Sequence, residues 1–111
     1  MEAAFSRRVT DVGDVHLVSL AGELDMATAV GLADWLVSVA GSDVVVDLSG
    51  LSFVDSTGIA ALAQARGLIE QAGSELRLTR PQRPVERVLE IVGLAGWVDP
   101  WQTAWDPDHG A

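Results

Sequence analysis

The sequence contains no cysteine and no lysine, because all seven of its basic residues are arginines. The lack of cysteine excludes disulfides, thiolate catalysis and cysteine-based zinc sites. The lack of lysine excludes a P-loop, Schiff-base chemistry and a lysine general base, and it disfavours a receiver-type phosphoaspartate domain. Histidine occurs only as His16 and His109, and neither lies in a recognisable catalytic triad. We therefore expect a protein that is not an enzyme and that carries no metal or cofactor.

Long apolar runs and excess positive charge are also missing. The net charge is −9, whereas contacts to nucleic-acid phosphates or anionic lipid headgroups need a basic surface. No apolar stretch is long enough to span a membrane, because Asp34 and Gln64 interrupt the longest candidates. The residues Met1–Phe5 lack the basic start and apolar run of a signal peptide. We expect a cytoplasmic protein with neither a nucleic-acid nor a membrane partner.

The 111 residues, 49% of them hydrophobic, suit one domain with one core over residues 1–111. Within this domain, residues 100–111 are expected to form a loosely ordered tail. The negative charge is uneven, since residues 1–65 hold nine acidic side chains and two arginines. Such an acidic region favours a basic partner.

The apolar periodicity predicts alternating strands and helices. Strands are expected at 5–10, 15–20, 44–48 and 75–78, with a last short strand at 97–98, and helices at 25–40, 56–72 and 84–92. The close turn after the first strand predicts an antiparallel hairpin, and the helices between later strands predict parallel pairing. The expected class is therefore α/β, with a mixed, mostly parallel sheet of four to five strands and helices packed on it.

Polar loops are expected at residues 22–25 and 49–56, where two strands end. Because the carboxyl ends of parallel strands share one edge of a sheet, we expect Asp25 to lie near Asp55 and Ser56. Asp25 is placed to cap the helix that follows it. Asp47 interrupts an apolar run, so its carboxylate needs a donor from a loop.

The segment Asp55-Ser56-Thr57-Gly58 opens the second helix. A hydroxyl there faces free backbone N–H groups and the positive end of the helix dipole, where a phosphate can be accommodated. Ser, Thr and Asp are also the residues that cap helices best, so a purely structural role is the alternative. A third interpretation is that Ser56 is a catalytic nucleophile, but the sequence shows no base to activate it.

Four segments together resemble the STAS domain of the anti-sigma factor antagonist family. They are Gly22-Glu23-Leu24-Asp25 with Thr28-Ala29, Val46-Asp47-Leu48-Ser49, Phe53-Val54-Asp55-Ser56-Thr57-Gly58, and Val92-Gly93-Leu94. The resemblance extends over residues from about 5 to 99 and implies the STAS fold.

The resemblance also implies a function. The unphosphorylated antagonist binds an anti-sigma factor that is also a serine kinase of the GHKL type, and this binding releases the sigma factor. The kinase phosphorylates a serine that corresponds to Ser56, with Thr57 as the alternative acceptor; binding is then lost until a serine phosphatase restores it. The partner-binding residues carried over are Gly22, Glu23, Asp25, Asp55, Ser56, Thr57 and Gly58. The alternative function is a STAS scaffold or ligand-binding regulatory module that is not phosphorylated.

Overall fold

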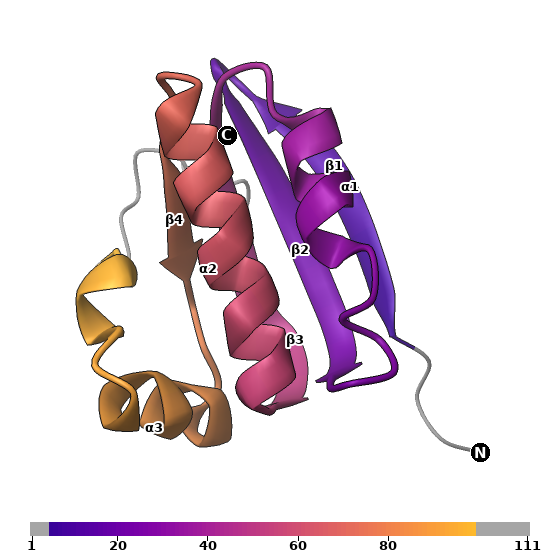
Figure 1. The fold of residues 1–111 in the computed structure, drawn as a ribbon, viewed down its shortest axis with the longest axis vertical. Coiled ribbons are helices and arrows are strands. Elements are labelled where there is room, and N and C mark those ends of the chain that lie inside the picture. The colour runs from indigo at the N-terminus through magenta and orange to yellow at the C-terminus, as the bar shows by residue number, and fades with distance from the viewer. Residues whose placement is uncertain (1–4, 100–111) are drawn as a thin grey trace.

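The computed structural model describes residues 5–99, which form one four-stranded sheet with helices packed against it (Figure 1). Its elements are β1 (Ser6–Val12), β2 (Val15–Leu24), α1 (Leu32–Val39), β3 (Asp43–Val54), α2 (Ser56–Gln71), β4 (Leu76–Thr79), α3 (Arg83–Ile91) and a short 3₁₀ helix (Ala95–Trp97). The tail predicted at residues 100–111 lies outside the described residues.

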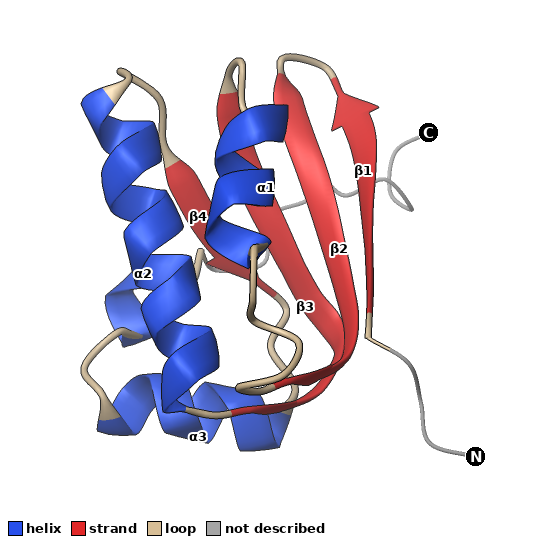
Figure 2. Cartoon of the chain, turned by 45° about the vertical axis from the view of Figure 1, so that its right-hand side comes forward, coloured by secondary structure: helices blue, strands red, loops and turns tan. Residues whose placement is uncertain are grey.

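The strands follow the order β1-β2-β3-β4, with β1 antiparallel to β2 and the other neighbours parallel. α1 and α2 lie side by side on one face of the sheet, and α3 crosses beneath the end of β4 (Figures 1 and 2). This arrangement confirms the predicted α/β class with a mixed, mostly parallel sheet. None of the helices in the described part of the chain is long and apolar enough to cross a membrane.

The core lies between the sheet and the helices, because alternate strand side chains point toward α1 and α2. Val18 and Val46 from the strands are fully buried there with Leu36 of α1, and Leu62 of α2 is 2% exposed. Each large apolar side chain buried in this way contributes about 1.5–3 kcal/mol. Every residue of the apolar run at 44–48 is buried, as is typical of a strand covered on both faces of a sheet.

The first helix begins later than predicted. A helix was expected from Asp25, but residues 26–31 form turns and α1 begins at Leu32. Gly31 has a φ of 78°, a left-handed conformation that interrupts a helix and that glycine adopts without strain. Ala29, in the segment that precedes α1, packs against the core.

The prediction of a polar loop at residues 49–56 is also wrong, because β3 continues to Val54. β2 is likewise longer than expected and ends at Leu24. The two strands stay paired to their ends, with register shifts that absorb the irregular polar sequence. Leu51 and Val54 are buried on this extension, so the pairing buries apolar surface that local sequence patterning did not reveal.

The last short strand predicted at residues 97–98 does not form. Ala95–Trp97 is a 3₁₀ helix, and Val98 makes only an isolated parallel bridge to Leu78 of β4. The Asp99 N–H also donates to the Leu78 carbonyl at 2.9 Å. The described chain therefore follows the edge of β4 without adding a fifth strand.

Asp47 has the partners that its burial requires. Its carboxylate accepts hydrogen bonds from the Ser49 N–H at 2.9 Å and from Arg80 Nη2 at 2.7 Å. Burial alone would raise the pKa of Asp47, but the bonds from Arg80 and Ser49 outweigh it and hold the pKa below its ordinary value. The prediction of a loop donor is confirmed.

Asp47→Asn is expected to lower the free energy of unfolding at neutral pH by about 1 kcal/mol, since Arg80 loses its ionic partner but remains one-third exposed. The lowered pKa means that this stabilisation is present above the unfolded-state pKa of about 4 and is lost as pH falls through the folded-state pKa. Urea unfolding of both proteins between pH 3 and pH 7 measures the difference. A difference that stays constant down to pH 3 would contradict the assignment.

Candidate functional site

The candidate site lies where β2 and β3 end side by side, at the lower edge of the sheet in Figure 1. Leu24 pairs with Val54, and the Asp55 N–H donates to the Leu24 carbonyl at 3.1 Å. The residues that follow the two strands, Asp25 and Asp55, are thereby brought together. The predicted proximity of Asp25 to Asp55 and Ser56 is confirmed.

The segment between β2 and α1 is closed by its own hydrogen bonds. Asp25 Oδ1 accepts from the N–H groups of Ala27 at 3.0 Å and Thr28 at 3.1 Å. The Thr28 hydroxyl donates to the Glu23 carbonyl at 2.7 Å and accepts from the Asp25 N–H at 2.9 Å. Asp25 therefore caps a turn that precedes the helix, not α1 itself.

Asp55 is the N-cap of α2. Its Oδ1 accepts from the Thr57 hydroxyl at 2.5 Å and from the Gly58 N–H at 3.0 Å. The hydrogen bond from Thr57, with that from the Gly58 N–H next, holds the pKa of Asp55 below its ordinary value. The start of α2 therefore carries a fixed negative charge at neutral pH.

The two hydroxyls after Asp55 differ in their surroundings. Ser56 is exposed, and its hydroxyl has no hydrogen-bond partner within residues 5–99. Thr57 is half-buried, and its hydroxyl is engaged with Asp55. Of the two hydroxyls, that of Ser56 is thus the accessible one.

The two glycines of the predicted site are buried structural positions. A Cβ on Gly58 would lie 2.7 Å from Leu24 Cγ and 2.8 Å from Val54 Cγ2, so α2 sits directly on the strand ends only because this residue is glycine. Gly22 is buried in β2, and its carbonyl accepts from the Ser52 hydroxyl at 3.1 Å. Both residues position the site without presenting a side chain to a partner.

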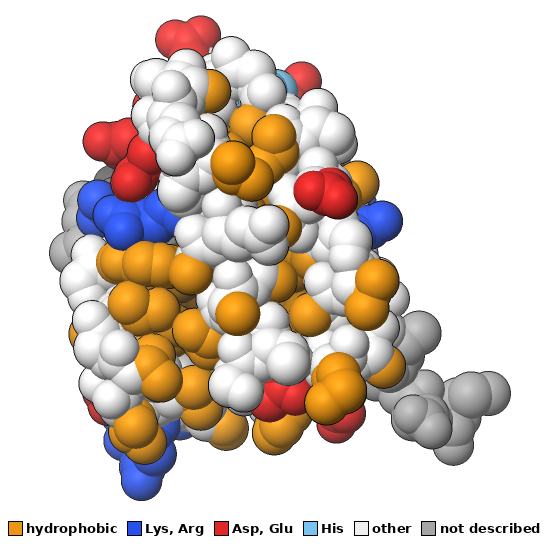
Figure 3. Space-filling view, in the orientation of Figure 1, with side chains coloured by type: hydrophobic (Ala, Val, Ile, Leu, Met, Phe, Trp, Pro, Cys, Tyr) orange, Lys and Arg blue, Asp and Glu red, His pale blue; other side chains and the backbone are white. Residues whose placement is uncertain are grey.

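Exposed apolar side chains border the site. The sequence patterns did not indicate them. Met26 and Val30, in the segment between β2 and α1, are 71% and 79% exposed, and Phe53 near the end of β3 is 46% exposed. Figure 3 shows hydrophobic side chains gathered with acidic ones on the lower part of this face. Met26 and Val30 are spaced one helical turn apart, and this apolar pair was the signal in the sequence that could have indicated the surface.

The one histidine among residues 5–99 lies far from Ser56. The His16 ring Nδ1 donates a hydrogen bond to the Asp11 carboxylate at 2.6 Å. From His16 to the end of β2 the strand rises about 25 Å. Among residues 5–99, no group of three His, Asp or Glu side chains is placed to hold a metal ion. Ser56 therefore carries an exposed hydroxyl next to the Asp55 carboxylate, which its lowered pKa keeps ionised at neutral pH.

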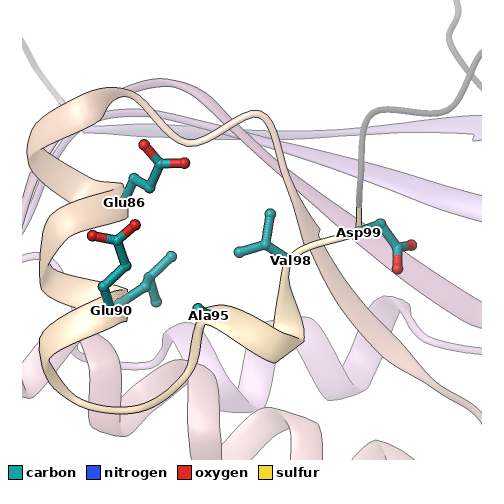
Figure 4. Close-up of a pocket in the computed structure, with 6 residues that line it drawn as sticks. Glu86, Glu90, Ala95, Val98 and Asp99 are labelled. Atoms are coloured by element: carbon teal, nitrogen blue, oxygen red, sulfur yellow. The ribbon is translucent and has the colours of Figure 1, made fainter.

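A pocket of about 200 Å³ lies elsewhere, between α3 and the segment that follows it (Figure 4). Glu86, Leu89 and Glu90 line it from α3, and Ala95, Val98 and Asp99 line the opposite side. Asp99 also forms an ion pair with Arg77. None of the predicted site residues lines this pocket.

Comparison with known proteins agrees with the resemblance seen in the sequence. The model of the STAS domain family matches residues 6–105. The anti-sigma-B factor antagonist of Bacillus subtilis (strain 168) is 31% identical over 84 residues, which are 74% of this chain and 77% of the relative.

Solved structures have the same fold. An anti-sigma factor antagonist from Mycobacterium paratuberculosis superposes with a TM-score of 0.79 at 25% identity, covering 91% of this chain and 92% of its own. The anti-sigma factor antagonist SpoIIAA in its unphosphorylated form superposes with a TM-score of 0.74 at 21% identity, covering 89% of each chain. The chain therefore belongs to the STAS domain family, among the relatives of the anti-sigma factor antagonists.

Proposed function

We propose that this chain is an anti-sigma factor antagonist that is switched by phosphorylation of Ser56. Its unphosphorylated form binds an anti-sigma factor that is also a serine kinase of the GHKL type, and this binding releases the sigma factor. Phosphorylation by the same kinase ends the binding, and a serine phosphatase restores it. The chain itself catalyses no reaction and acts in the cytoplasm.

The observation that carries the proposal is the contrast between the two hydroxyls at the start of α2. The Ser56 hydroxyl is exposed and unpaired within the described residues, whereas the Thr57 hydroxyl is engaged with Asp55. The proposal therefore takes Ser56 as the acceptor and gives Thr57 a structural role. Glu23 and Asp25 supply negative charge nearby, and the exposed Met26 and Val30 supply apolar surface for the partner.

Incubation with the cognate kinase and ATP tests the acceptor. We expect the intact mass to rise by one phosphate, with the modification mapped to Ser56. Ser56→Ala is expected to abolish labelling, whereas the matched variant Thr57→Val, which keeps the shape but loses the hydroxyl, is expected to be labelled. Labelling that maps to Thr57 would move the acceptor, and no labelling by a verified active kinase would favour the unphosphorylated scaffold.

A further inference from the structure

β1 forms one edge of the sheet. Among residues 5–99 it pairs only with β2, and Figure 2 shows it as the outermost strand. The outward backbone N–H and C=O groups of such a strand can pair with a strand of another chain. Five of its seven residues are exposed, and Val9 and Val12 are half-buried.

The charged side chains of β1 are ordered along this edge. Arg7, Val9 and Asp11 share the face that carries the helices, since Val9 pairs with the buried Val18 and Arg7 Cζ lies 4.7 Å from the ring centroid of Trp35. The Asp11 side chain is 73% exposed. The edge therefore presents a cation, an apolar residue and an anion at successive positions of one face.

We propose that β1 pairs antiparallel with β1 of a second copy of this chain, about a two-fold axis at Val9. This register places Arg7 of each copy opposite Asp11 of the other, so that two cation–anion pairs flank the axis. Opposite charges placed directly across a pair of strands stabilise the pairing. The two sheets then form one continuous sheet through an isologous interface.

The charges also select this register over its neighbours. Residues directly opposite each other on antiparallel strands point to the same face of the sheet, whereas successive residues of one strand point to opposite faces. The two-fold axis therefore cannot pass between two residues of β1 and must pass at one residue, which then lies opposite its own copy. An axis at Arg8 places that arginine opposite its own copy, and like charges directly opposite are destabilising. An axis at Thr10 leaves Asp11 opposite Val9 and pairs no arginine with a carboxylate.

The same edge of the sheet is hollowed near the start of β1. A depression of about 320 Å³ is lined by Ser6, Arg7, Arg8, Ser19 and Ala21. In the proposed register Val12 of the second copy lies opposite Ser6, whose small side chain leaves room for an apolar neighbour. Shape and charge therefore favour the same alignment.

Engineered cysteines test the alignment directly, because the chain has none of its own. Val9→Cys places two thiols on the axis, where Cα atoms about 4.5–5.5 Å apart allow a disulfide. The matched control Val12→Cys places its two thiols about 20 Å apart. Under mild oxidation we expect at least about tenfold more cross-linked dimer from Val9→Cys than from Val12→Cys. Equal cross-linking of the two variants would overturn the register.

Charge reversal tests the pairing without cross-links. Sedimentation equilibrium of the full chain is expected to show a concentration-dependent dimer. Arg7→Asp or Asp11→Arg is expected to weaken that dimer about tenfold, and the double variant to restore it. Within one copy, Arg7 contacts Trp35 and Asp11 contacts His16, and the double variant loses both of these contacts. A dimer restored in the double variant therefore reports the contact between copies. A wild-type monomer at all concentrations, or a dimer indifferent to the reversals, overturns the proposal.

Discussion

Gly58→Ala is expected to lower the free energy of unfolding by about 2–3 kcal/mol, although alanine is the better helix former. The added Cβ would lie 2.7 Å from Leu24 Cγ, 2.8 Å from Val54 Cγ2 and 2.9 Å from the Leu24 carbonyl oxygen. The side chains can adjust, but the carbonyl belongs to the end of β2 and already accepts the Asp55 N–H. The start of α2 must therefore move away from the sheet. Urea denaturation measures the change.

Gly67→Ala is the matched control, because Gly67 lies in the same helix and a Cβ there meets nothing within 4 Å. This substitution is expected to raise the free energy of unfolding by about 0.5–1 kcal/mol, since alanine loses less backbone entropy in a helix. The two substitutions are chemically identical and differ only in their surroundings. If both stabilise the protein, the close packing of Gly58 on the strand ends is not a constraint.

Local signals predicted α2 and its cap well. Asp55 followed by two hydroxyl residues is a strong helix start, and the predicted helix at 56–72 differs from α2 by one residue at its end. The proximity of Asp25 and Asp55 also followed from sequence, because parallel strands place their carboxyl ends at one edge. These features depend on a few adjacent residues or on strand order alone.

The sequence did not predict where β2 and β3 end or where α1 begins. These positions depend on contacts across the sheet. Residues 49–54 contain Ser49, Gly50 and Ser52, which locally favour a loop, yet pairing with β2 extends β3 to Val54. Asp25 signals a cap, but its carboxylate closes a turn with Ala27 and Thr28 instead. A sequence pattern cannot decide between these local alternatives, because the partner strand decides them.

The same misplacement explains why the apolar border of the site was missed. Within a continuous helix from Asp25, Met26 and Val30 would lie on an ordinary solvent-facing surface. In the structure they belong to the segment between β2 and α1, beside Asp55, and are 71% and 79% exposed. An exposed apolar cluster next to fixed carboxylates is typical of a surface that binds another protein.

Ser56→Asp is expected to weaken binding to the anti-sigma factor by at least about tenfold while the fold remains intact. The new carboxylate lies at the N-terminus of α2, where the helix dipole stabilises a negative charge by about 0.3–1 kcal/mol, so the free energy of unfolding changes little. Across the interface the same charge must be desolvated beside Asp55, which its low pKa keeps ionised. A tenfold loss needs only about 1.4 kcal/mol, and a phosphate carries about −1.5 to −2 charge and is expected to weaken binding further.

Ser56→Ala and Thr57→Val separate charge from shape in this experiment. Titration calorimetry with the anti-sigma factor is expected to give Ser56→Ala an affinity within about threefold of the wild type, because the exposed hydroxyl has no partner within the described residues. Thr57→Val removes the hydrogen bond that lowers the pKa of Asp55, so its effect is expected on stability first. If folded Ser56→Asp binds as tightly as the wild type, negative charge at position 56 does not control binding of the anti-sigma factor. The segment Asp55–Gly58 then serves only to start α2 and is not a switch.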